Sequence, residues 1–189
     1  MVIMGKTAES FSNLCSSAYE CWQMHKIMCE YKIDDESGIW GRFGTILQHY
    51  WVLQIAKIND PEKHGKDYNF SLAYFVARVN KASYTGFYNK FLEDNKEFIE
   101  AIKKARVKVA AHRDLEVFNS PDGVGAFSKG LDENYFNSLH KIILEGYKEL
   151  GLGSFPEWPL FIVEDTIIFM NKIEKTFNAP NEYLNTNHF

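Results

Sequence analysis

The chain has 189 residues, of which 46% are hydrophobic, 15% aromatic and 24% charged. This composition excludes wholesale disorder and collagen-like or low-complexity chains, and the length is that of one domain able to bury a sizeable core. The formal charge is −4, so a protein that coats nucleic acid non-specifically is excluded and any nucleic-acid contact must be local.

Helical periodicity begins near the N-terminus. Apolar and semi-apolar residues recur in steps of four and three from Phe11 to Cys29, which predicts a first helix. Ser37 then offers an N-cap for a second helix that runs to about Ile58. Its apolar residues repeat the same pattern at Ile39, Phe43, Ile46, Tyr50 and Leu53.

Four more helices follow, separated by loops that contain Pro, Gly and helix-capping residues. Asn69 is the expected cap of the first of them and Asp132 that of the third, and the pattern breaks around Tyr84 to Gly86. The four are predicted to cover about 70–76, 91–115, 132–150 and 159–177.

The fold class follows from these elements. No strand-type alternation, internal repeat or interdomain linker is found, so we predict an all-α, antiparallel up-and-down bundle of about five to six helices. Residues 1–178 should form a single domain, followed by a loose, polar tail over 179–189.

The three cysteines, Cys15, Cys21 and Cys29, are an odd number in one short segment. This argues against a disulfide framework, and with no apolar run suited to a signal peptide or a membrane span it predicts a cytoplasmic protein without membrane contact. Cys21, His25 and Cys29 resemble a stripe of metal ligands, but together they span about 12 Å of helix axis, too far for one zinc ion. We therefore expect them to pack in the core, and we predict no metal or other cofactor.

One segment concentrates positive charge. Five of the 21 basic residues fall within the eleven positions 103 to 113, and the first acid after them is Asp114. A solvated helix end is one interpretation, because the helix dipole favours cations at the C-terminus. An RNA phosphate site is the other, in which an arginine holds the phosphate and His112 moves protons near neutral pH. The basic residues are Lys103, Lys104, Arg106, Lys108 and Arg113.

Two motifs resemble the HEPN superfamily. Arg106, five residues and then His112 match its Arg-(four to six)-His motif, and 111–114 (Ala-His-Arg-Asp) resemble its "AHxD" form. Val107 departs from the family, where the residue after the arginine is commonly polar.

The second motif resembles the abortive-infection AbiU-type branch. There a helix ends in a "LarLtDP" stretch, followed by a glycine-containing loop and "NLSL". Here the matching segment 49–61 ends in Asn59-Asp60-Pro61, then come Gly65 and 69–72 (Asn-Phe-Ser-Leu). The resemblance covers roughly residues 10 to 150.

The resemblance implies a function. HEPN proteins are small helical bundles, usually dimeric, and many are metal-independent endoribonucleases that serve as toxins or phage-defence effectors, often with a nucleotidyltransferase-like antitoxin. By matching position, Arg106 and His112 would be the catalytic pair, with both protomers contributing to one cleft. The substrate-binding residues would be Lys103, Lys104, Lys108, Arg113 and Asp114.

Helix geometry bears on that expectation. Six residues rotate by about 600°, so Arg106 and His112 lie roughly 120° apart around a helix and ~9 Å apart along it. They converge more easily with a second copy across a two-fold axis, which predicts a homodimer. Two alternatives remain: a non-catalytic module of the same fold that binds RNA, nucleotide or a protein, and a structural helical protein whose basic helix end is incidental.

Overall fold

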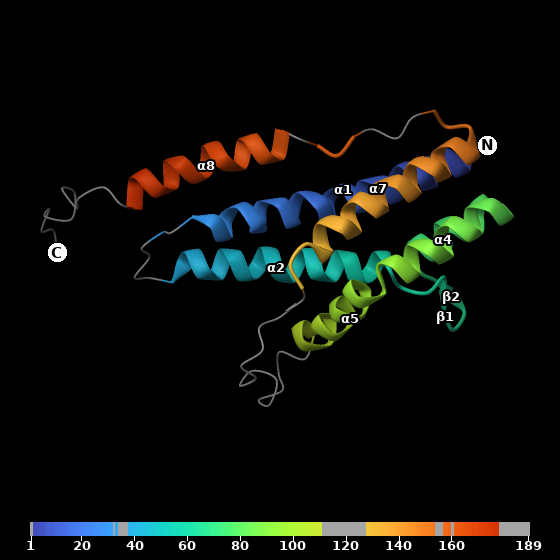
Figure 1. The fold of residues 1–189 in the computed structure, drawn as a ribbon, viewed down its shortest axis with the longest axis horizontal. Coiled ribbons are helices and arrows are strands. Elements are labelled where there is room, and N and C mark those ends of the chain that lie inside the picture. The colour runs from blue at the N-terminus through green and yellow to red at the C-terminus, as the bar shows by residue number, and fades with distance from the viewer. Residues whose placement is uncertain are drawn as a thin grey trace, which may run out of the picture.

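The structure, a computed structural model, describes residues 2–31, 33, 38–110, 128–153, 157–159 and 161–177. These residues form seven helices and one short hairpin (Figure 1), which confirms the all-α fold class. The expected cap Ser37 and the tail 179–189 lie outside the described residues. The helices are α1 (Val2–Glu30), α2 (Ile39–Ile58), α3 (Leu72–Val79), α4 (Ala82–Asp94), α5 (Lys96–Ala110), α7 (Leu131–Leu150) and α8 (Phe161–Phe177), and the hairpin pairs β1 (Lys63–His64) with β2 (Asp67–Tyr68).

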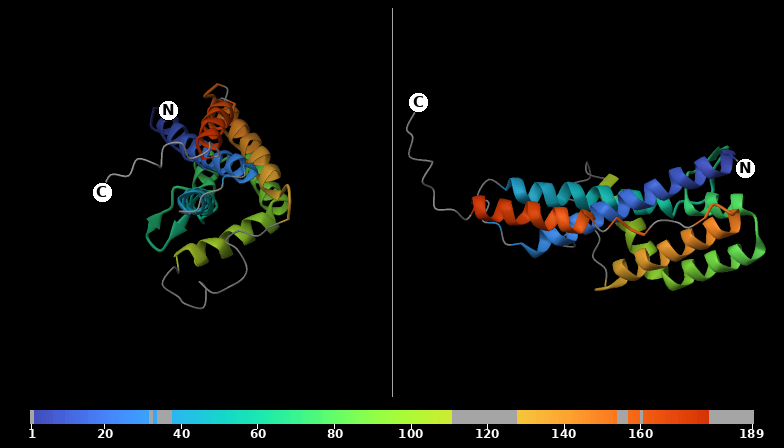
Figure 2. Two further views of the ribbon diagram at one scale, coloured as in Figure 1. Left: turned by 90° about the vertical axis from the view of Figure 1, so that its left-hand side faces the viewer. Right: turned by 90° about the horizontal axis from the view of Figure 1, so that it is seen from above.

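Helix α1 runs through the middle of the molecule. It packs antiparallel along α2 and carries α8 on another side, while α7 crosses it (Figures 1 and 2). Helices α3, α4 and α5 gather around the C-terminal end of α2 and contact α7. None of the helices in the described part of the chain combines the length and apolar character needed to cross a membrane.

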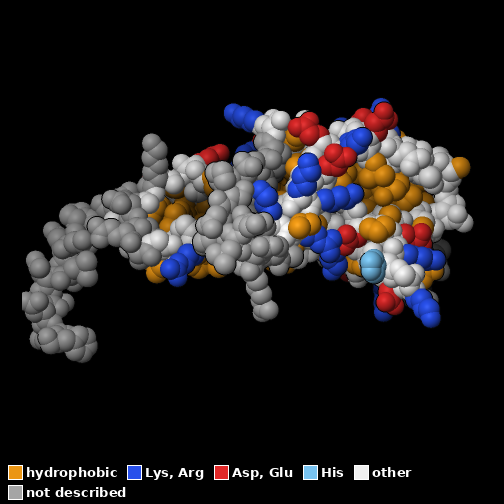
Figure 3. All heavy atoms as spheres, turned by 90° about the horizontal axis from the view of Figure 1, so that it is seen from below, with side chains coloured by type: hydrophobic (Ala, Val, Ile, Leu, Met, Phe, Trp, Pro, Cys, Tyr) orange, Lys and Arg blue, Asp and Glu red, His pale blue; other side chains and the backbone are white. Residues whose placement is uncertain are grey.

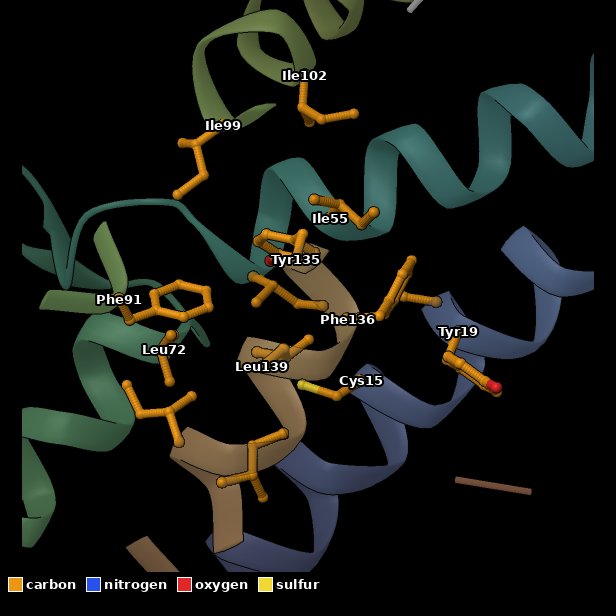
Figure 4. Packing of buried hydrophobic residues seen from close by; sticks show 14 of the residues in the cluster. Cys15, Tyr19, Ile55, Leu72, Phe91, Ile99, Ile102, Tyr135, Phe136 and Leu139 are labelled. Atoms are coloured by element: carbon orange, nitrogen blue, oxygen red, sulfur yellow. The ribbon is translucent and has the colours of Figure 1, made fainter. Parts of the chain in front are cut away.

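Aromatic side chains fill the main core, where α1, α2 and α7 meet (Figure 4). Phe11 stacks on Phe75 with ring centroids 5.2 Å apart, and Tyr19 stacks on Trp158 at 4.9 Å. Tyr135 is fully buried among these elements. Offset and edge-on aromatic pairs of this kind add to the free energy gained from burial, so the large aromatic content is used mainly inside the protomer.

The apolar stripe predicted for the second helix lies on α2 and faces solvent. The buried face of α2 carries Trp51, Val52, Ile55, Ala56 and Ile58 instead. Helix α2 has two apolar faces, and periodicity alone does not say which one the rest of the chain covers. The five stripe residues are 39–63% exposed: Ile39, Phe43, Ile46, Tyr50 and Leu53.

The division between α4 and α5 also differs from the prediction. The expected break around Tyr84 to Gly86 lies inside α4, and the helix ends at Asn95. The buried Asn95 side chain donates from Nδ2 to the Phe91 carbonyl at 2.8 Å. An asparagine that bonds its own preceding turn competes with helix continuation, so α4 and α5 are two helices.

Two predicted caps are replaced. Ser71, not Asn69, caps α3, with its Oγ accepting from the Tyr74 amide at 3.3 Å. Helix α7 begins after Gly130, whose φ of 88° is in the left-handed region, and Asp132 instead accepts from Trp22 Nε1 at 2.8 Å. In both cases a polar side chain expected to serve a helix end is used in a contact with another element.

Cys21, His25 and Cys29 on α1 are expected from the sequence to pack in the core, and none of the three is fully buried. Cys15 is buried, but Cys21 is half-buried and Cys29 is exposed, so core packing is wrong for Cys29. His25 is half-buried and its Nε2 lies 3.7 Å from Cys29 Sγ. Among the described residues, no group of three or more His, Cys, Asp or Glu side chains could hold a metal ion.

Gly146 gives the first prediction, because α7 approaches α3 and α4 there without a side chain. A Cβ at this position would lie 2.5 Å from Phe75 Cε1 and 2.6 Å from the Tyr84 hydroxyl, which donates to the Ile142 carbonyl at 2.8 Å. Gly146→Ala should therefore destabilise the protein by about 1–3 kcal/mol in urea unfolding. Gly86→Ala, in α4 with nothing within 4 Å, is the control and should stabilise by up to about 1 kcal/mol. Equal effects would contradict the close packing.

His25 gives a pH prediction. Burial lowers the pKa of its imidazole below the ordinary value of 6.5, so the unfolded chain binds a proton at a pH where the folded chain does not. The free energy of unfolding therefore has its full contribution from neutral His25 above about pH 6.5. It should decrease as the pH falls below that value. In urea unfolding between pH 7 and 5, His25→Gln should lose less stability than the original chain. An unchanged slope would contradict a neutral, half-buried His25.

Candidate nucleic-acid interface

Helix α5 presents the basic residues. Its buried stripe packs toward α2 and α7, and the opposite side faces solvent. Lys103, Lys104 and Arg106 are exposed and Lys108 is half-buried. Figure 3 shows Lys and Arg side chains gathered near the middle of the underside, where Figure 1 places α5. The buried stripe consists of Phe98, Ile99, Ile102, Ala105 and Val109.

Arg106 is held by an acid from another element. Its Nη1 donates to Oδ1 of Asp60 at 2.6 Å, and the two side chains are 46% and 24% exposed. Asp60 stands in the turn directly after α2, where its amide donates to the Lys57 carbonyl at 3.2 Å. A guanidinium has five N–H donors in a planar fork, so one bond to Asp60 orients the group and leaves capacity for an anion such as a phosphate.

The residues of the second sequence motif build the scaffold around Asp60. Asn59 donates from Nδ2 to the Tyr135 hydroxyl at 2.6 Å and to the Ile55 carbonyl at 2.8 Å, which ties the end of α2 to α7. Asn69 donates from Nδ2 to the Pro61 carbonyl at 2.8 Å and so closes the base of the hairpin. The motif therefore fixes the turn that carries Asp60 through hydrogen bonds at both of its ends.

The hairpin after this turn adds aromatic and basic groups. In the hairpin, the Lys63 ammonium lies 4.5 Å from the centre of the Tyr68 ring, and on the following helix α3 the Arg78 guanidinium lies 4.8 Å from that of Tyr74. Tyr68 is 52% exposed. Exposed aromatic rings beside cations are typical of surfaces that bind single-stranded nucleic acid, because bases stack on the rings while cations contact the backbone.

The other end of α5 has the opposite charge. A hollow of about 420 Å³ at its N-terminus is lined by several carboxylates, which would repel a phosphate. Acids at the start of a helix and bases at its end both complement the helix dipole. The dipole therefore accounts for part of the arrangement without a ligand, but it does not require the ion pair between Arg106 and Asp60. The carboxylates are those of Glu93, Asp94, Glu97 and Glu100.

The predicted site is thus seen in part. Lys103, Lys104, Arg106 and Lys108 share the C-terminal half of α5, while His112, Arg113 and Asp114 lie outside the described residues. Asp60 lies within the second sequence motif, and the motif by itself does not indicate its contact with Arg106. The contact between Asp60 and Arg106 joins residues 46 positions apart. The only feature of the sequence that could have indicated it is the acid in the Asp60-Pro61 pair of the motif.

Comparison of the chain with known protein families, with curated proteins and with solved structures finds no match in any of the three. The site is therefore interpreted from its own residues and geometry. The resemblance to HEPN proteins is carried by the two motifs alone, and the function that it implies is a proposal.

The ion pair between Arg106 and Asp60 should contribute little to stability, because both side chains are in contact with water. In a double-mutant cycle with Arg106→Ala and Asp60→Ala, the coupling in urea unfolding should be about 0.2–1 kcal/mol. The pair of Glu145 and Lys148 on α7, with 2.6 Å between Oε1 and Nζ, is the control and should give about 0.2–0.5 kcal/mol. A coupling several times larger at Arg106 would make the pair a structural element rather than part of a binding surface.

Proposed function

We propose that the protein is a metal-independent endoribonuclease of the HEPN Arg-x5-His type, with Arg106 and His112 as the catalytic residues. The observation that carries this proposal is the position of Arg106. It is oriented by Asp60, half exposed, and set among Lys103, Lys104 and Lys108 in a chain whose net charge is −4. An oriented arginine among other cations can hold and stabilise a phosphate that gains negative charge.

The chemistry assigns a role to each group. His112 removes the proton of an RNA 2′-hydroxyl while the 2′ oxygen attacks the adjacent phosphorus. The bond from phosphorus to the 5′ oxygen breaks, and that oxygen takes the proton back from His112. The products are a 2′,3′-cyclic phosphate and a 5′-hydroxyl. Arg106 stabilises the charge that develops on the phosphoryl oxygens. Lys103, Lys104, Lys108, Arg113 and Asp114 form the substrate-binding surface around the backbone.

The biological setting belongs to the same proposal. By resemblance, the protein would be a cytoplasmic toxin or phage-defence effector of the abortive-infection kind, and a homodimer. Its activity would then be controlled by an antitoxin protein. RNA is the proposed substrate, and no metal or other cofactor takes part in the reaction.

A non-catalytic module that binds RNA through the same surface is the second candidate. Two observations favour it. Asp60 offsets part of the charge of Arg106 at 2.6 Å. Val107, where HEPN proteins commonly have a polar residue, is 65% exposed and presents no group that could align a histidine or a substrate.

RNA cleavage separates the two candidates. Purified protein should cleave a mixed RNA in the presence of EDTA, and the products should carry 2′,3′-cyclic phosphate ends. Arg106→Ala and His112→Ala should each slow cleavage by about 10²–10³, by analogy with loss of an oxyanion-hole donor. Lys96→Ala, at the other end of α5, is the matched control and should keep full activity.

Three results would contradict the endoribonuclease. Rescue of an EDTA-inhibited reaction by magnesium would mean a different mechanism. Full activity of Arg106→Ala would mean that the motif is structural. Salt-dependent RNA binding that decreases with Lys104→Ala, without any cleavage, would establish the binding module instead.

A further inference from the structure

The exposed stripe of α2 has the spacing of a helix-pairing seam. Its five residues follow one another in steps of four, three, four and three, which is the heptad pattern of two packed helices. The opposite face of the same helix is buried in the protomer. A helix that is apolar on both sides is one that is covered on both sides.

The stripe reaches the smallest size expected of a specific interface. A large apolar side chain offers roughly 200 Å², so exposed fractions of 39–63% over five residues correspond to about 500 Å² on each copy. Contiguous apolar patches of this size on a monomer are often functional. Two copies would bury about 1,000 Å² from these residues alone, which reaches the lower limit of specific protein interfaces.

The pattern of the stripe is symmetric to within one residue about Ile46, its middle and most exposed member at 63%. Aromatic Phe43 and Tyr50 flank it, and aliphatic residues follow on both sides. If two copies of α2 cross antiparallel at Ile46, Phe43 of each copy faces Tyr50 of the other. A two-fold interface requires this kind of self-complementary surface.

Charge selects the antiparallel direction. Lys57 occupies the next position of the seam, one step of four beyond Leu53, and is exposed. In a parallel pair it would face its own copy, and like charges directly opposed are unfavourable. In an antiparallel pair the two lysines lie about 33 Å apart along the seam, at 1.5 Å per residue. The antiparallel pair also aligns the two helix dipoles favourably.

We propose that the α2 stripe binds a second copy of this chain, forming a two-fold, antiparallel helix pair centred on Ile46. This inference does not depend on the proposed ribonuclease activity. It has a consequence for that activity, because Asp60 lies 14 residues beyond Ile46. The two Asp60–Arg106 pairs would then be about 40 Å apart along the seam, and this pairing would give two separate sites rather than one shared cleft.

Light scattering tests the oligomeric state. At micromolar concentration the original chain should have twice its mass of 21.9 kDa. Ile46→Glu should give the single mass with unchanged helicity, because Ile46 is exposed in the protomer. Phe87→Glu, which alters another exposed apolar residue, 51% exposed on α4, is the control and should remain dimeric. A monomeric original chain, or an Ile46→Glu dimer, would overturn the proposal.

Disulfide trapping tests the direction, in a chain with Cys21→Ser and Cys29→Ser. Ile46→Cys should cross-link to its own copy on mild oxidation, because the two positions meet at the axis. Leu53→Cys should not, because its two copies lie about 21 Å apart in the antiparallel pair. Cross-linking of Leu53→Cys as fast as Ile46→Cys would indicate a parallel pair, and failure of Ile46→Cys would exclude the seam. Either result overturns the proposal.

Discussion

The hydrogen bond between Asn59 and Tyr135 connects the core to the candidate site. Tyr135 is fully buried, and burial raises the pKa of its hydroxyl, whose oxygen needs a hydrogen-bond partner in the core. Asn59, the residue directly after α2, donates from Nδ2 to the Tyr135 hydroxyl oxygen, and the two atoms are 2.6 Å apart. Because Asp60 is the next residue, the bond that satisfies the core also fixes the carboxylate that orients Arg106.

The site combines attraction and restraint within one ion pair. Asp60 holds Arg106 in one geometry, which lowers the entropy lost when the guanidinium meets a phosphate. The same carboxylate reduces the positive potential that would draw RNA to this end of α5. Under the proposed function, the balance between these effects would decide whether the surface only binds RNA or also stabilises a transition state. The hairpin that follows Asp60 along the chain carries the exposed Tyr68 beside Lys63, a pair on which an unpaired base could stack under the proposed function.

The two-sided helix α2 changes how a dimer relates to the site. The spacing of Arg106 and His112 and the resemblance to HEPN proteins both lead to a cleft shared by two protomers. The pairing that we propose for the exposed seam centred on Ile46 would instead separate the two copies of Arg106. Under that pairing, each protomer must assemble its own arginine and histidine, and the dimer serves to cover apolar surface rather than to complete the chemistry.

The sequence by itself determined the helical class, the ends of two helices at Ile58 and Leu150, and the basic half of α5, because these depend on local periodicity, propensity and charge. Tertiary structure decided three other features. It selected which apolar face of α2 is buried, because both faces satisfy a helical period. It placed the helix break at Asn95, where a buried amide bonds its own turn. It also joined Asp60 to Arg106, because a contact between distant residues depends on how helices pack and leaves no trace in a local pattern.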